Sequence, residues 1–67
     1  MSLFEGFNRR YQTELVEEIS VIDVSLLAGN IADFTEYKRM TGRRAGLLYA
    51  LERHKELLTL MEEANDK

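Results

Sequence analysis

The 67-residue chain contains no proline, so the residue that most strongly interrupts helices is missing throughout. Its four glycines stand at positions 6, 29, 42 and 46, and Gly29 is followed by Asn30, which also tolerates the left-handed conformation that ends many helices. Asp33 and Glu36 then have the spacing of a capping box. We therefore predict an all-α chain with one helix over about residues 4–28, a turn at 29–32 and a second helix over about 33–64.

Apolar residues recur at spacings of three and four in both segments, which is typical of helices that bury one face. In the second segment the stripe is Tyr37, Met40, Arg44, Leu47, Leu51, His54, Leu58 and Met61. In the first segment it is Phe4, Phe7, Tyr11, Leu15, Ile19, Ile22 and Leu26. Residues 19–24 alternate like a strand and are rich in β-branched side chains, but a lone strand would have no partner. An alternative is that Ser20 and Asp23 form a second capping box and break the first helix.

The expected fold is an antiparallel helical hairpin in one domain, residues 1–67. A chain this short buries little surface, and without cysteine it has no disulfide. Two helices also cover only one side of each other, so we expect the hairpins to assemble into a helical-bundle oligomer. The residues expected at this interface are Gly42, Gly46, Ala50, Leu47, Leu51, Leu58, Leu15, Ile19 and Ile22.

Three small residues at four-residue intervals, Gly42, Gly46 and Ala50, predict a groove along the second helix. The groove would let another helix approach closely, either the first helix of the same chain or one from a second copy. If it does, Gly46→Leu is expected to destabilise the protein by overpacking. If the groove is only exposed surface, the same substitution should instead stabilise the helix, because leucine is a better helix former than glycine.

His54 is the single histidine of the chain, and no neighbour in sequence is suited to activate it. We interpret it as a structural residue; the alternatives are a metal or acid–base role, or two rings that meet across an oligomer axis and make association sensitive to pH. The sequence also contains no phosphate-binding loop, nucleophile elbow, metal motif or dinucleotide fingerprint. We therefore expect a protein that is not an enzyme and binds no cofactor or metal.

Four basic residues, Lys38, Arg39, Arg43 and Arg44, form the densest charge cluster, although the net charge is −3. That balance disfavours nucleic acid and favours an acidic protein surface, either the Glu17 and Glu18 face of another copy or a different protein. The longest apolar run, residues 45–51, is too short to span a bilayer, and the N-terminal residues lack the pattern of a signal peptide.

The segments Asp33-Phe34-Thr35-Glu36-Tyr37-Lys38 and Gly42-Arg43-Arg44-Ala45-Gly46-Leu47-Leu48-Tyr49-Ala50-Leu51 resemble a group of very small helical proteins of short-tailed, podovirus-type bacteriophages. The resemblance covers about half of the chain, from the turn onward. It implies a phage origin, and hence a location in the host cytoplasm or the virion, but carries no catalytic residues.

The leading hypothesis for function is a self-associating helical adaptor that contacts head, portal or other virion proteins. One alternative is a small inhibitor that binds a host enzyme or a defence protein. A second alternative is a nucleic-acid accessory factor that uses residues 38–44.

Overall fold

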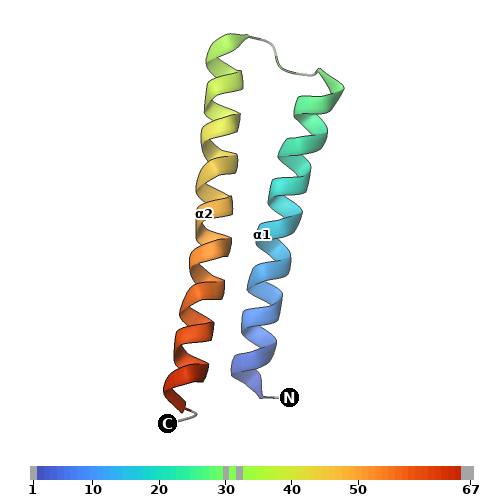
Figure 1. The fold of residues 1–67 in the computed structure, drawn as a ribbon. Helices are drawn as coiled ribbons and strands as arrows, with labels where there is room; N and C mark the ends of the chain where they lie inside the picture. The colour runs from blue at the N-terminus through green and yellow to red at the C-terminus, as the bar shows by residue number, and fades with distance from the viewer. Residues whose placement is uncertain (1, 30, 32, 66–67) are drawn as a thin grey trace.

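The computed structural model describes residues 2–29, 31 and 33–65, and it shows two long helices, α1 (Leu3–Ala28) and α2 (Phe34–Asn65). The helices run antiparallel and side by side, so that the start of α1 lies near the end of α2 (Figure 1). No strand occurs among the described residues. The chain is therefore an all-helical hairpin, as predicted, and its helices begin and end within one residue of the expected positions.

Three helix ends carry a cap: the start of α1, the end of α1 and the start of α2. The Ser2 hydroxyl accepts a hydrogen bond from the Glu5 amide at 3.1 Å, and the Asp33 carboxylate accepts one from the Glu36 amide at 2.8 Å. Gly29 adopts φ 70°, where a side chain would be strained, and its N–H donates to the carbonyl of Leu26. These caps satisfy backbone groups that a helix leaves without partners, and so define where the turn lies.

Helix α1 is continuous through residues 19–24, so the alternative of a break at Ser20 and Asp23 is wrong. Asp23 does not cap a helix in the structure. Its carboxylate binds the guanidinium of Arg44 on α2 instead. The β-branched residues remain helical because one of them, Ile22, is buried, and tertiary packing outweighs their weak preference against helix.

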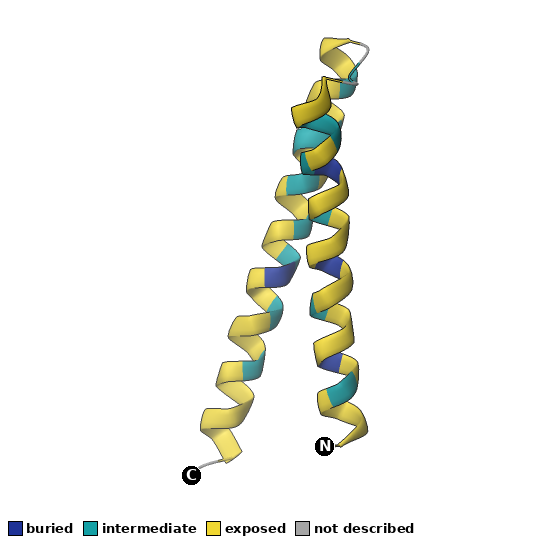
Figure 2. Ribbon diagram, turned by 90° about the vertical axis from the view of Figure 1, so that its right-hand side faces the viewer, coloured by how far each residue is buried: buried dark blue, intermediate teal, exposed yellow. Residues whose placement is uncertain are grey.

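The core is a narrow seam where α1 and α2 meet. Only Leu15, Ile22 and Leu51 are buried apolar residues among those described. Figure 2 shows buried positions at intervals along α1, where they are Asn8, Leu15 and Ile22, whereas Leu51 is the one buried residue described on α2. On α2 the seam follows the predicted stripe from Met40 to Leu58, whereas Tyr37 and Met61 at its two ends are exposed. The stripe advances by about 3.5 residues per turn, the repeat that keeps two helices in contact over a long distance.

The aromatic end of the predicted α1 stripe is not in this seam. Phe4, Phe7 and Tyr11 are exposed, and Asn8 and Gln12 take their places against α2. The physical reason is the spacing of the stripe. From Phe4 to Leu26 it advances by about 3.7 residues per turn, so it winds around α1 relative to a seam that repeats every 3.5 residues.

Candidate interaction surface

A polar layer interrupts the apolar seam near the open end of the hairpin. The Nε2 atom of His54 lies 3.0 Å from Oδ1 of Asn8, and its Nδ1 atom lies 3.1 Å from Nε2 of Gln12. Tyr11 packs edge-on against the imidazole, with ring centroids 5.1 Å apart. With the amides oriented in this way, Nε2 donates to Asn8 and Nδ1 accepts from Gln12, as a neutral imidazole can do.

This layer gives His54 a structural environment, because both of its ring nitrogens already have partners on α1. No group of three or more potential metal-ligating side chains is present in the part of the chain that the structure describes. Sequence reasoning did not find Asn8 and Gln12. A repeat of 3.5 residues counted back from Leu15 falls on both positions, and this was the available signal.

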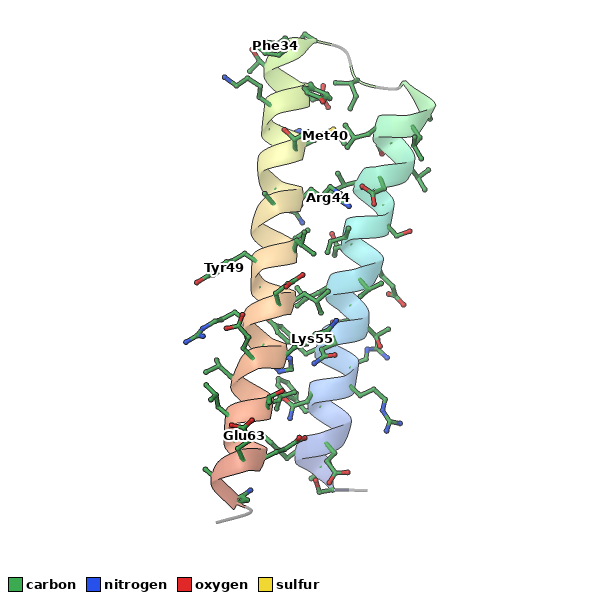
Figure 3. All side chains as sticks on the ribbon, in the orientation of Figure 1. Phe34, Met40, Arg44, Tyr49, Lys55 and Glu63 are labelled. Atoms are coloured by element: carbon green, nitrogen blue, oxygen red, sulfur yellow. The ribbon has the colours of Figure 1, made fainter. Side chains whose placement is uncertain are left out.

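The basic cluster is engaged within the chain. Arg44 binds both carboxylate oxygens of Asp23, at 2.5 and 3.3 Å. This hydrogen bond and the attraction between the two charges raise the pKa of Arg44 above its ordinary value. Figure 3 shows the Arg44 side chain directed toward α1. Arg43 forms an ion pair with Glu18 of α1 at 3.2 Å.

The other two basic residues of the cluster have neighbours on α2 itself. Arg39 forms an ion pair with Glu36 at 3.7 Å, and the ammonium of Lys38 lies 5.5 Å from the centre of the Phe34 ring. Of the two acidic residues expected to attract the cluster, Glu18 does so within the same chain. These contacts are exposed and each contributes little to stability, so they remain available for exchange with a partner.

Most of the residues expected at an oligomer interface lie along the seam between the two helices of one chain. Leu15, Ile22 and Leu51 are buried there, and Ile19, Leu47 and Leu58 are half-buried.

The small-residue groove lies elsewhere on α2. Gly42 and Gly46 are exposed, Ala50 is half-buried, and a Cβ atom added at either glycine would meet nothing within 4 Å. The groove therefore does not receive α1, and in the hairpin it is open surface.

The ion pair between Arg43 and Glu18 marks one side of the seam. Residues seven apart occupy the same side of such a seam, so Tyr11 and Phe4 lie on this side of α1, and Ala50 and Leu57 on this side of α2. Phe7 stacks on Tyr11 with ring centroids 6.2 Å apart. Leu60 follows Leu57 by one turn. We call the exposed apolar residues near the open end of this side the aromatic face; it consists of Phe4, Phe7, Tyr11, Leu57 and Leu60.

The opposite side of the seam is more polar. A shallow groove there is lined by Arg9, Gln12, Thr13, Val16, Glu17, Leu51 and Lys55. Leu48 lies on this side too, seven residues before Lys55. Charged groups thus line the groove on this side. On the other side the apolar residues of the aromatic face lie near the open end, and charged residues such as Glu18 and Arg43 follow toward the turn.

Comparison of the chain with protein-family models, with curated proteins and with solved structures finds no match. Among the described residues, neither helix combines the length and the apolar character that crossing a membrane requires.

Proposed function

We propose that the protein is a non-enzymatic assembly or adaptor protein that functions as an oligomer. The observation that carries this proposal is the imbalance between buried and exposed apolar surface. Three apolar side chains are buried among the described residues, while large apolar side chains such as Phe7 and Leu27 are 65% and 89% exposed. Soluble proteins seldom leave such surface uncovered unless another molecule binds it.

The polar side chains support an adhesive role. His54 binds both Asn8 and Gln12, and Arg44 binds Asp23, so these groups join α1 to α2. Buried or half-buried polar contacts of this kind specify how helices align. The remaining surface then offers its shape and its apolar area to a partner, and these are the means by which assembly proteins bind.

The resemblance to small proteins of short-tailed bacteriophages supports a place for this adaptor in virion assembly, in contact with head or portal proteins. Mass spectrometry of purified particles tests that part of the proposal. Stoichiometric presence of the chain in the particles supports the virion role. If infected cells contain the protein but the particles purified from them do not, binding to a host protein is favoured instead.

The oligomer is tested on the purified protein by light scattering after size exclusion and by thermal melting over a range of concentrations. We expect a mass above the 7.8 kDa of one chain at micromolar concentration and a melting temperature that rises with concentration. A helical monomer of 7.8 kDa that melts cooperatively at the same temperature at every concentration would overturn the proposal.

A further inference from the structure

We infer that the aromatic face binds the aromatic face of a second copy, in a four-helix bundle whose two-fold axis runs parallel to the helices. The inference rests on the proposed function and adds the surface, the occupant and the orientation. It follows from the chemistry of the face, its area and the distribution of charge over the two helices.

The chemistry of the face requires an apolar occupant. Phe4 and Leu60 are 54% and 55% exposed, and the side chains between them on the face are apolar or aromatic. Aromatic residues of this kind supply much of the apolar area in interfaces. The members of the face on α1 lie at about the same height along the hairpin as those on α2, because Gln12 of α1 contacts His54 of α2.

The broad side of the hairpin, of which the aromatic face forms the open end, is large enough for a dimer interface. Between Cα atoms the molecule measures 52 × 19 × 13 Å, so its broad side projects about 1,000 Å², compared with about 800 Å² buried per partner in an interface of standard size. A second copy thus provides an occupant with the same length and the same apolar pattern.

The charges that continue the face toward the turn differ between the helices. On α1 the position seven residues after Phe7 is Glu14, and seven after Tyr11 is Glu18. On α2 the position seven before Leu60 is Arg53, and Arg43 lies beside Glu18. The surface between the aromatic face and the turn is therefore acidic on α1 and basic on α2.

This distribution selects the axis. A two-fold axis parallel to the helices places α1 of one copy on α2 of the other with the open ends together, so that Glu14 lies within one helical turn of the height of Arg53 of the second copy. An axis perpendicular to the helices would place α1 on α1, which sets Glu14 and Glu18 against the same residues of the second copy and puts the two apolar ends apart. Like charges in contact disfavour that arrangement.

The present contacts of Glu14 and Arg53 permit these two residues to pair between copies. Glu14 binds Arg10 at 3.2 Å and Arg53 binds Glu56 at 3.0 Å, both as exposed pairs within one turn of a helix. Such pairs are weak, so exchanging them for contacts between copies costs little. The open surface at Gly46, on the same side of α2, leaves room for the α1 backbone of the second copy.

The location of the interface is tested with Leu60→Glu, for which Leu48→Glu is the matched control on the opposite side of the same helix. Burying a carboxylate once in each copy is expected to raise the dimer dissociation constant by about 100-fold or more, while the control retains the dimer. Analytical ultracentrifugation measures both constants, and circular dichroism shows whether each variant is helical.

If the wild type is oligomeric and Leu60→Glu weakens the dimer no more than Leu48→Glu does, the inference is wrong and the proposed function stands. If the wild type is monomeric, the proposed function itself fails.

The orientation is tested with Glu14→Arg and Arg53→Glu, two exposed substitutions that do not depend on the core. Each variant alone is expected to dimerise more weakly than the wild type, because both of its contacts between copies bring like charges together. An equimolar mixture restores both contacts and is expected to form a heterodimer at least tenfold tighter than either homodimer. Two variants that dimerise as the wild type does, or a mixture without a gain, would rule out the parallel axis.

Discussion

Truncation of Leu51 is the sharpest test of the seam between α1 and α2. This side chain is 7% exposed, and Leu51→Ala removes three carbon groups from it. At about 0.8 kcal/mol for each methylene-sized group, the loss of burial amounts to about 2.4 kcal/mol. The cavity adds little, because Leu51 borders a surface groove into which Val16 and Lys55 can move. We expect a loss of about 2–3 kcal/mol in the free energy of unfolding.

That loss is large for this chain, since a domain of this size has a total stability of about 3–10 kcal/mol. The corresponding fall in melting temperature is about 10–20 °C. Tyr49→Ala is the control, because Tyr49 lies two residues away, is 71% exposed and points away from α1 (Figure 3). Its expected effect is within about 0.5 kcal/mol. Urea unfolding of both variants at one protein concentration measures the difference, and equal losses would refute the placement of the seam.

Three further predictions concern the cap of α2, the groove and the pairing of the helices. Asp33→Ala removes the acceptor of the Glu36 amide hydrogen bond and should lower the free energy of unfolding by about 1 kcal/mol in urea titrations, with Asp33→Asn close to the wild type. Gly42→Ala should raise it by about 1 kcal/mol with no change in molecular mass, because the added methyl group meets nothing within 4 Å; a lower melting temperature would mean that another chain covers Gly42. Arg44→Asp should lower the melting temperature by placing two carboxylates together, and adding Asp23→Arg should recover part of the loss; no recovery would show that the pair does not join the helices.

The helices themselves could be predicted because local signals determine them. The absence of proline, the pair Gly29 and Asn30, and the cap at Asp33 act over a few residues each. The α2 seam could also be predicted, since its stripe already has the spacing of a long contact between two helices.

The polar contacts could not be predicted, because they join residues far apart in the chain. His54 lies 46 residues from Asn8 and 42 from Gln12, and Arg44 lies 21 residues from Asp23. The α1 stripe was misleading near its start for a different reason. The aromatic residues Phe7 and Tyr11 satisfy a helical period just as well as Asn8 and Gln12 do, and only the partner helix decides which pair is turned inward.

The polar contacts of His54 and Arg44 also determine which misaligned hairpins the chain can form while it folds. In a seam of aliphatic residues alone, α2 could slide along α1 by seven residues and meet an equally good surface. Here a slide in one direction sets His54 against Ile19, and a slide in the other sets Arg44 against Val16. Either arrangement leaves a polar or charged group beside a hydrocarbon without its partner. The slipped hairpins are therefore separated in energy from the native one, and a small core can still specify a single structure.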